Sequence, residues 1–249
     1  MERLPKRLSL DEFSQHKGHQ DFVTTVVDLD QHELLEVFDS HKKDEIQAAF
    51  EVYPLEVRAE VEEVSVDMWG SYAAVIESVF PNARIVYDRF HVMQHVNREL
   101  NSLRRKLKVK FRGLPHLLWK NRDQLSEEQK QRLDEGLKAF PCLTIAYQLK
   151  EELRAIYERC RTAHGALVKL QRWLQFARLF YQESAEMIER HLSGICNYFE
   201  NRTTSGVTEG INTKIKLIKR QGYGFHNFEH FRLRLLSCFG ASQKSTHKV

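Results

Sequence analysis

The sequence predicts an α/β fold, in which a mixed five-stranded sheet with flanking helices carries a large all-helical insertion. Three observations lead to this expectation. Five short segments with strand-like patterns lie within the first 90 residues. Helical patterns precede the fourth and fifth of these segments, as in a sheet with parallel neighbours. Strand patterns then stop, and helical periodicity extends over residues 91–192.

The first three strands are expected to form an antiparallel meander. Residues 8–13 alternate apolar and polar side chains, as a half-buried strand does. Residues 22–27 are rich in β-branched side chains, and residues 32–38 form the third segment. The polar connections between these segments are short, which suits antiparallel pairing of consecutive strands.

Two helix–strand units follow the meander. Residues 42–52 place apolar side chains on one helical face, and residues 61–66 predict the fourth strand. Residues 69–80 predict a second helix, which ends before Pro81, and residues 83–87 predict the fifth strand. Because helices connect these strands, each of them is expected to run parallel to a neighbour in the sheet.

The remaining helices define the expected domain organisation. The long helical stretch is interrupted near residues 113–115, at Pro141 and near Gly165. Two further helices are expected at residues 207–219 and 227–239, and a pair of glycines ends the first of them. No linker separates independent domains. We therefore expect one core with an insertion, divided into residues 1–100 for the first part of the core, 101–195 for the insertion, and 196–249 for the C-terminal helices that complete the core.

Composition excludes several classes of protein. Hydrophobic residues make up 42% of the 249 residues, an ordinary share for a folded globular chain. No apolar run approaches the ~20 residues that cross a bilayer, and no signal peptide opens the sequence. The four cysteines are far apart and form no C-x-x-C pair, which argues against a zinc site or a disulfide framework. We therefore expect a cytoplasmic protein.

The net charge of +4 is modest, but the charges are distributed unevenly. Acids outnumber bases between residues 28 and 63, whereas bases dominate residues 84–122 and 214–220. Such blocks indicate contact with the phosphates of nucleic acid, and a solvated helix face is the alternative. The residues expected to contact nucleic acid are Arg89, Arg104, Arg105, Lys106, Arg202, Lys214, Lys216, Lys219, Arg220 and, in a glycine-flanked turn, Tyr223.

Two aspartates occupy related places in the predicted sheet. Asp11 follows the apolar pair of the first strand, and Asp67 directly follows the fourth strand. If these strands are parallel neighbours, both carboxylates come together beyond the same edge of the sheet. Converging carboxylates repel each other unless a cation lies between them, and hard oxygen ligands suit Mg²⁺ or Mn²⁺. The alternative for either residue alone is an acid at a strand end or a helix cap.

Glu209 is a single acid within a basic helix. On a helical wheel it falls opposite an apolar stripe and shares its face with Lys216 and Arg220. A capping box would need Ser or Thr three residues earlier, where Gly206 stands, and a solvated surface Glu is the other alternative. A lone carboxylate among bases therefore indicates chemistry on a polyanion.

A further acid ends the fifth strand. Asp88 begins the sequence Asp-Arg-Phe-His and is either a ligand itself or orients Arg89 or His91. For His91, a metal ligand is one interpretation, and a residue that supports the ligands or contacts phosphate is the other. Both residues are possible accessory members of the site.

Four passages carry a resemblance to the DDE catalytic domain of bacterial insertion-sequence transposases of the ISL-three type. They are residues 10–13 with 17–19, residues 64–72, residues 85–92, and residues 202–216 with 223–225. The resemblance implies an RNase H-like core with a helical insertion before the last catalytic acid. It also implies two divalent ions, Mg²⁺ or Mn²⁺, that assist cleavage of phosphodiesters at transposon ends. On the family pattern Asp11, Asp67 and Glu209 are the three catalytic and metal-binding acids, and Asp88 matches a further acidic position.

One departure from the family leaves alternatives open. Full-length relatives carry an N-terminal zinc-binding and helix-turn-helix region, whereas Asp11 lies almost at the start here, so we expect an amino-truncated chain. The expected function is metal-dependent DNA cleavage and strand transfer in the bacterial nucleoid, with a second copy or a full-length transposase as partner. The alternatives are a remnant that binds DNA or a full-length transposase without catalysis, and another RNase H-like nuclease such as a junction resolvase.

Overall fold

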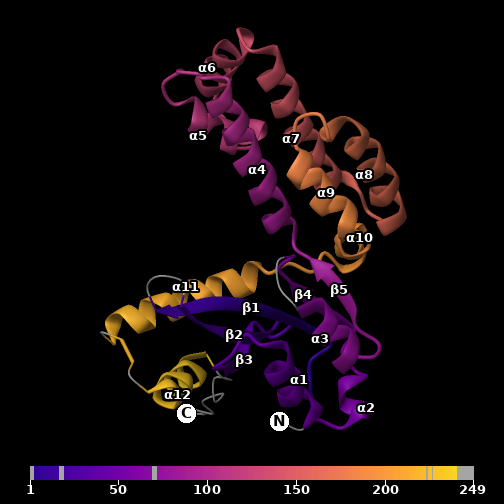
Figure 1. The fold of residues 1–249 in the computed structure, drawn as a ribbon, viewed down its shortest axis with the longest axis vertical. Helices are drawn as coiled ribbons and strands as arrows, with labels where there is room; N and C mark the ends of the chain where they lie inside the picture. The colour runs from indigo at the N-terminus through magenta and orange to yellow at the C-terminus, as the bar shows by residue number, and fades with distance from the viewer. Residues whose placement is uncertain (1–2, 17–19, 69–71, 223, 226, 240–249) are drawn as a thin grey trace, which may run out of the picture. The chain divides into compact units, whose positions relative to one another are not determined.

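The structure, a computed structural model, describes residues 3–16, 20–68, 72–222, 224–225 and 227–239. The chain forms two compact units (Figure 1). The core unit contains the residues up to Asp88 and those from Thr203 onward, and the helical unit contains Arg89–Arg202. The expected functional division at residues 100 and 195 stays a prediction.

The core unit contains a mixed five-stranded sheet with the order β3-β2-β1-β4-β5. The first three strands pair antiparallel, and β4 runs parallel to both β1 and β5. This arrangement confirms the predicted fold class, an α/β fold of RNase H-like topology. The strands are β1 (Arg7–His16), β2 (Gln20–Asp28), β3 (Glu33–Phe38), β4 (Glu63–Val66) and β5 (Arg84–Tyr87).

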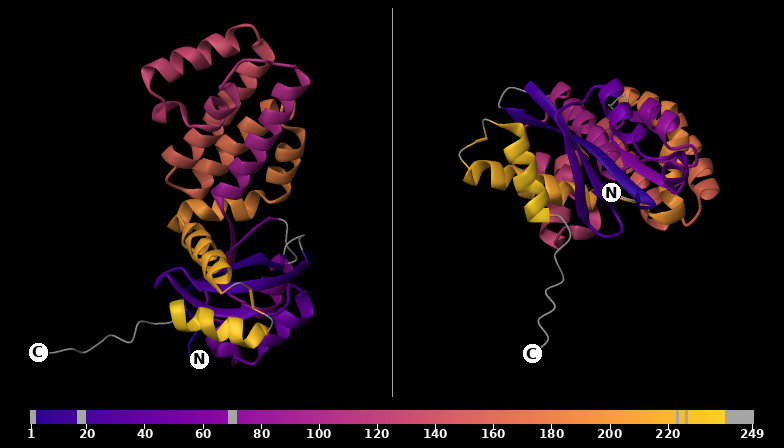
Figure 2. Two further views of the ribbon diagram at one scale, coloured as in Figure 1. Left: turned by 90° about the vertical axis from the view of Figure 1, so that its left-hand side faces the viewer. Right: turned by 90° about the horizontal axis from the view of Figure 1, so that it is seen from below.

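Helices cover both faces of this sheet (Figures 1 and 2). The long helix α11 lies along β1, and α12 packs against β3. Helices α1 and α3 pack against each other on the opposite face, where the buried Tyr72 hydroxyl is 2.9 Å from the Thr24 hydroxyl of β2. The helices of the core unit are α1 (Lys43–Glu51), α2 (Leu55–Arg58), α3 (Tyr72–Val79), α11 (Gly206–Gln221) and α12 (Phe228–Phe239).

An apolar cluster fixes α11 and α12 to the sheet. Ile211 and Ile215 of α11 are buried together with Phe13 of β1, as the wheel predicts for the apolar stripe. The Phe231 ring of α12 lies 6.2 Å from the Phe13 ring and 4.9 Å from the Phe225 ring, measured between centroids. Because these side chains come from both helices and the sheet, their burial sets where α11 lies on β1.

The helical unit is built from α4 to α10 and one short 3-10 helix. Glu99 of α4 accepts bonds from the backbone amides of Glu183 and Ser184, 3.2 and 3.0 Å away, and so caps the start of α9. The elements are α4 (Arg89–Lys106), α5 (Leu114–Trp119), η1 (Arg122–Gln124), α6 (Glu127–Lys138), α7 (Pro141–Arg159), α8 (Ala163–Ala177), α9 (Gln182–Arg190) and α10 (Leu192–Asn201).

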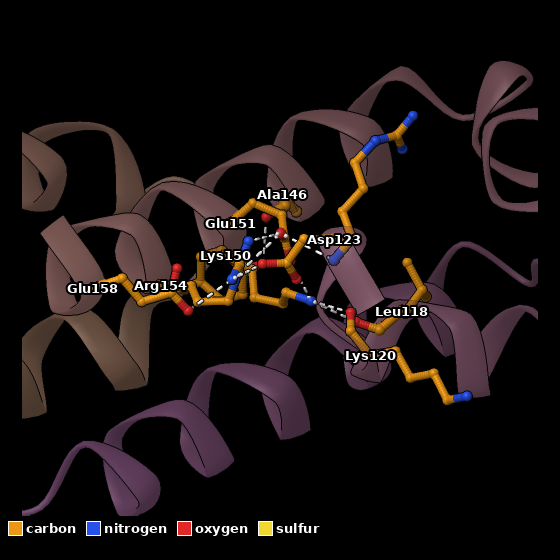
Figure 3. A network of polar contacts seen from close by, with 10 residues as sticks. Leu118, Lys120, Asp123, Ala146, Lys150, Glu151, Arg154 and Glu158 are labelled. Carbon is orange, nitrogen blue, oxygen red and sulfur yellow. Dashed lines mark hydrogen bonds and ion pairs between the residues drawn. The ribbon is translucent and has the colours of Figure 1, made fainter. Parts of the chain in front are cut away.

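A buried charged network links α5 and η1 to α7 (Figure 3). The ammonium group of Lys150 is fully buried and donates to the carbonyl oxygens of Leu118 and Lys120, 2.9 and 3.0 Å away. It also lies 2.8 Å from the Glu151 carboxylate, and Arg154 forms a second ion pair with Glu151. Burial lowers the pKa of the Lys150 ammonium.

A few sequence-based expectations need correction. The short helix α2 has no counterpart among the expected elements. The break expected near Gly165 lies between Arg159, where α7 ends, and Ala163, where α8 begins, and the N-cap Thr162 accepts a hydrogen bond from the Gly165 amide. The passages at residues 17–19 and 69–71 lie outside the described residues. In the part of the chain that is described, no helix is both long and apolar enough to cross a membrane.

Candidate active site

Asp11 and Asp67 occupy matching positions on neighbouring parallel strands. Ser9 of β1 pairs with Ser65 of β4, and each aspartate lies two residues beyond its serine. Because side chains alternate along a strand, both aspartates belong to the same face of the sheet as these serines. We expected the two acids to come together if the first and fourth strands were parallel neighbours. The structure shows that β1 and β4 are parallel neighbours.

The carboxylates of these two aspartates are half-buried and held by the backbone. Asp11 Oδ1 accepts a hydrogen bond from the Glu12 amide at 2.8 Å, and Asp67 Oδ1 accepts one from the Met68 amide at 2.6 Å. The second oxygen of Asp11, Oδ2, accepts a bond from the side-chain amide of Asn212 at 2.6 Å. These bonds restrict the rotation of both carboxylates.

Glu209 lies in the first turn of α11, the helix that runs along β1. Its backbone amide donates to the carbonyl oxygen of Ser205 at 2.9 Å, and its side chain is half-buried. Residues three apart share a helix face, so Glu209 lies one turn before Asn212, which contacts Asp11. Helix α11 thus places Glu209 on the side of the sheet that carries the two aspartates.

The described residues contain no group of three His, Cys, Asp or Glu side chains close enough to hold one metal ion as they stand. The three acids are related by strand register and by the Asn212 contact rather than by a closed ligand cage. Their donor atoms are all carboxylate oxygens, and this chemistry fits Mg²⁺ or Mn²⁺ better than zinc. Their assignment as ligands therefore remains a proposal.

Two buried acids anchor the segment that leads into α11. Asp88, which is 1% exposed, accepts hydrogen bonds from the Ser205 amide at 2.6 Å, from the Ser205 hydroxyl and from the Thr204 hydroxyl at 3.1 Å. Glu63 of β4 is fully buried, accepts a bond from the Thr203 hydroxyl and lies 3.7 Å from Arg84. The start of α11 is thereby fixed to the ends of two strands.

Sequence reasoning missed Glu63, Ser205 and Asn212. Asn212 carried a usable signal, since it lies three residues after Glu209 on the same helix face. Glu63 and Ser205 carried none, because their partners are 140 and 117 residues away in the sequence. Asp88, predicted as an accessory acid, accepts a hydrogen bond from the Ser205 amide at the start of α11.

The sequence of this chain was compared with known proteins and protein families. A family of transposases, the DDE transposases of the ISL3 type, matches residues 8–235. The chain belongs to the ISL3 family of DDE transposases. It is 31% identical to the transposase for insertion sequence element IS1001 of Bordetella parapertussis, over 93% of this chain and 60% of the relative. It is 28% identical to the transposase for IS1557 of Mycobacterium tuberculosis, over 89% of this chain and 57% of the relative. The chain thus spans somewhat more than half the length of these relatives.

Within this ISL3-family chain, some of the bases expected to contact DNA lie on α11. Lys214, Lys216 and Arg220 are exposed there, and burial lowers the pKa of the partly covered Lys219. The Lys214 ammonium lies 5.1 Å from the centre of the Phe239 ring. Tyr223 falls outside the described residues. These four bases share the helix that carries Glu209.

The other predicted DNA contacts belong to the helical unit. Arg105 and Lys106 are exposed in the last turn of α4, whose first turn contains Arg89 and His91. The guanidinium groups of Arg104 in α4 and Arg202 after α10 already donate hydrogen bonds to protein oxygens. Arg104 donates to Asn101 Oδ1 and the Val109 carbonyl, both at about 3 Å. Arg202 donates to the carbonyl oxygens of Tyr157 and Cys160, so a phosphate would compete with these bonds. The DNA role of all these residues remains a prediction.

Proposed function

We propose that this chain is the catalytic part of a transposase that cleaves DNA strands and transfers them during transposition of an insertion sequence. Family membership supplies the reaction class. The observation that carries the site assignment is the matched register of Asp11 and Asp67 on β1 and β4. Neighbouring parallel strands with acids at equivalent positions are suited to sharing a divalent cation.

Asp11, Asp67 and Glu209 are the proposed ligands of two Mg²⁺ or Mn²⁺ ions. When bound, such ions activate water or a DNA 3′-hydroxyl for attack and stabilise the leaving oxygen. The protein contributes fixed oxygen donors. The backbone amides of Glu12 and Met68 and the Asn212 side chain orient the two aspartates, and α11 carries Glu209 toward them.

The basic residues of α11 and α4 are the proposed DNA contacts. Their contacts would be made to phosphates and would therefore hold DNA without reading its sequence. The expected partners are transposon-end and target DNA together with a second copy or a full-length transposase. A protein with this substrate would act at the nucleoid, in the bacterial cytoplasm.

The test is Mn²⁺-dependent nicking of DNA that carries the ends of the element. Asp67→Asn and Asp11→Asn are expected to lower the nicking rate at least 1,000-fold, about 4 kcal/mol of lost transition-state stabilisation, while DNA affinity is retained. Glu62→Gln, an exposed acid four residues before β4 ends, is the matched control. Unchanged nicking by Asp67→Asn would contradict the site. DNA binding without nicking by the unaltered chain would favour the non-catalytic alternative.

A further inference from the structure

A buried amide oxygen beside Asp11 has no assigned partner. Asn212 is 7% exposed, and its Nδ2 donates to Asp11 Oδ2 at 2.6 Å. A carboxylate only accepts hydrogen bonds, so this contact fixes which end of the amide faces Asp11. The other end, Oδ1, is buried and has no hydrogen-bond partner among the described residues.

A buried oxygen of this kind lowers the stability of the folded chain unless a hydrogen-bond donor or a cation binds it. A buried acceptor without a partner costs about 1–3 kcal/mol, and native proteins usually supply water or an ion at such places. The two polar atoms of one amide group are joined through a single carbon, so Asn212 Oδ1 lies next to the Asp11 carboxylate. An amide carbonyl oxygen is also a hard ligand of the kind that divalent cations accept.

Within the described part of the chain, more buried oxygens without a hydrogen-bond partner belong to α11, β1 and β4. The Thr208 hydroxyl, one turn before Asn212 on α11, is fully buried and has no hydrogen-bond partner in the described chain. The same holds for the hydroxyls of Ser9 and Ser65, two residues before Asp11 and Asp67 on the same strands. Buried polar atoms of this kind are usually bonded by ordered water or an ion.

We propose that Asn212 is a further member of the metal site, with Nδ2 orienting the Asp11 carboxylate and Oδ1 serving as an oxygen ligand to a divalent cation or to a water bound to it. This inference rests on the proposed function. It adds to the three acids a neutral residue that no comparison assigns, on the same helix face as Glu209. The side-chain amide of Asn212 thereby connects α11 to Asp11 of β1.

Mn²⁺ titration of the full chain, followed by the electron paramagnetic resonance signal of free Mn²⁺, tests this role. Asn212→Leu keeps the size of the side chain but removes both polar atoms. Its Mn²⁺ dissociation constant is expected to rise 10- to 100-fold, the loss typical of residues that support metal ligands. Asn212→Asp keeps an oxygen and adds a charge, so it is expected to bind Mn²⁺ at least as tightly as the unaltered chain. Thr213→Val, at the exposed neighbouring position, is the matched control.

The Asn212 variants test the role of Asn212, and Asp67→Asn tests the proposed metal site itself. Asn212→Leu binding within twofold of the unaltered chain would overturn the role of Asn212 and leave only a buried water as the partner of Oδ1. Asn212→Asp binding as weakly as Asn212→Leu would overturn the role of Oδ1 as a ligand, because only the Nδ2 donor, which both variants lose, would then matter. If Asn212→Leu does not fold, the Asn212→Asp titration alone decides. If Asp67→Asn binds Mn²⁺ unchanged, the proposed metal site itself is wrong.

Discussion

Lys150 is a charged residue at the centre of the helical unit. Its ammonium group has three N–H donors, and three oxygens lie within 3.0 Å of its nitrogen, two of them the carbonyls that end α5. No helical turn follows these carbonyls, so no backbone amide of the helix reaches them. The Lys150 ammonium donates to them instead. A neutral side chain at this position would leave the two carbonyl oxygens without their donor.

Lys150→Met is therefore expected to destabilise the helical unit by about 2–4 kcal/mol, since it leaves two buried carbonyls unpaired. Urea unfolding followed by tryptophan fluorescence measures this, because Trp119 and Trp173 both belong to the unit. Lys169→Met on the exposed side of α8 is the control and should unfold like the unaltered chain. A Lys150→Met protein of unchanged stability would show that the ammonium is dispensable.

At the scale of elements, α11 connects the sheet to the proposed site, because it packs on β1 and carries both Glu209 and Asn212. Its apolar stripe packs on β1, and its start is bonded to Asp88 at the end of β5. The Asp88 carboxylate also lies at the N-terminal end of the helix, where the helix dipole favours a negative charge. Because the Glu209 amide bonds the Ser205 carbonyl, the position of Ser205 sets that of Glu209.

Asp88→Ala is expected to lower the stability of the core unit by about 2–4 kcal/mol, because the Ser205 amide and hydroxyl lose their buried acceptor. Thermal unfolding followed by circular dichroism measures this loss, and Ser205→Ala, which removes one of the bonds, should fall between Asp88→Ala and the unaltered chain. Glu56→Ala, an exposed acid of α2, is the control. Full stability of Asp88→Ala would mean that the entry of α11 is held by other contacts.

The helices and strands also show which features sequence patterns predict and which they miss. Period-two and helical patterns predicted all five strands and α11, because each pattern reports burial of a local face. They also predicted the apolar stripe of α11, with Ile211 and Ile215 buried. They missed α2, a four-residue helix too short for any periodicity.

The site was predicted unevenly for a physical reason. Asp67 directly follows β4, and such a strand end is visible in the sequence. Asp11 was also expected at the end of its strand, whereas β1 continues beyond it to His16. Glu63 and Ser205 act through partners that only the fold brings close. A local pattern carries no information on such long-range pairs.

At the scale of the whole molecule, the exposed bases of α11 belong to the proposed DNA contacts. Neutralising Lys216 and Arg220 together removes two phosphate contacts, so the slope of log affinity against log salt should become shallower by about 1–2. Fluorescence anisotropy with a labelled duplex between 50 and 200 mM salt, about the range over which such slopes are measured, gives this value. Lys43→Ala, an exposed base of α1, is the control. An unchanged slope would remove α11 from the DNA interface.

The central claim is that Asp11, Asp67 and Glu209 hold divalent metal ions for DNA cleavage. Anomalous diffraction at the manganese edge, from crystals of the full chain grown with DNA and Mn²⁺, locates such ions directly. We expect anomalous peaks in contact with the carboxylates of all three acids, and the loss of these peaks in Asp67→Asn. Peaks bound elsewhere, or none at these acids in crystals of a chain that nicks DNA, would contradict it.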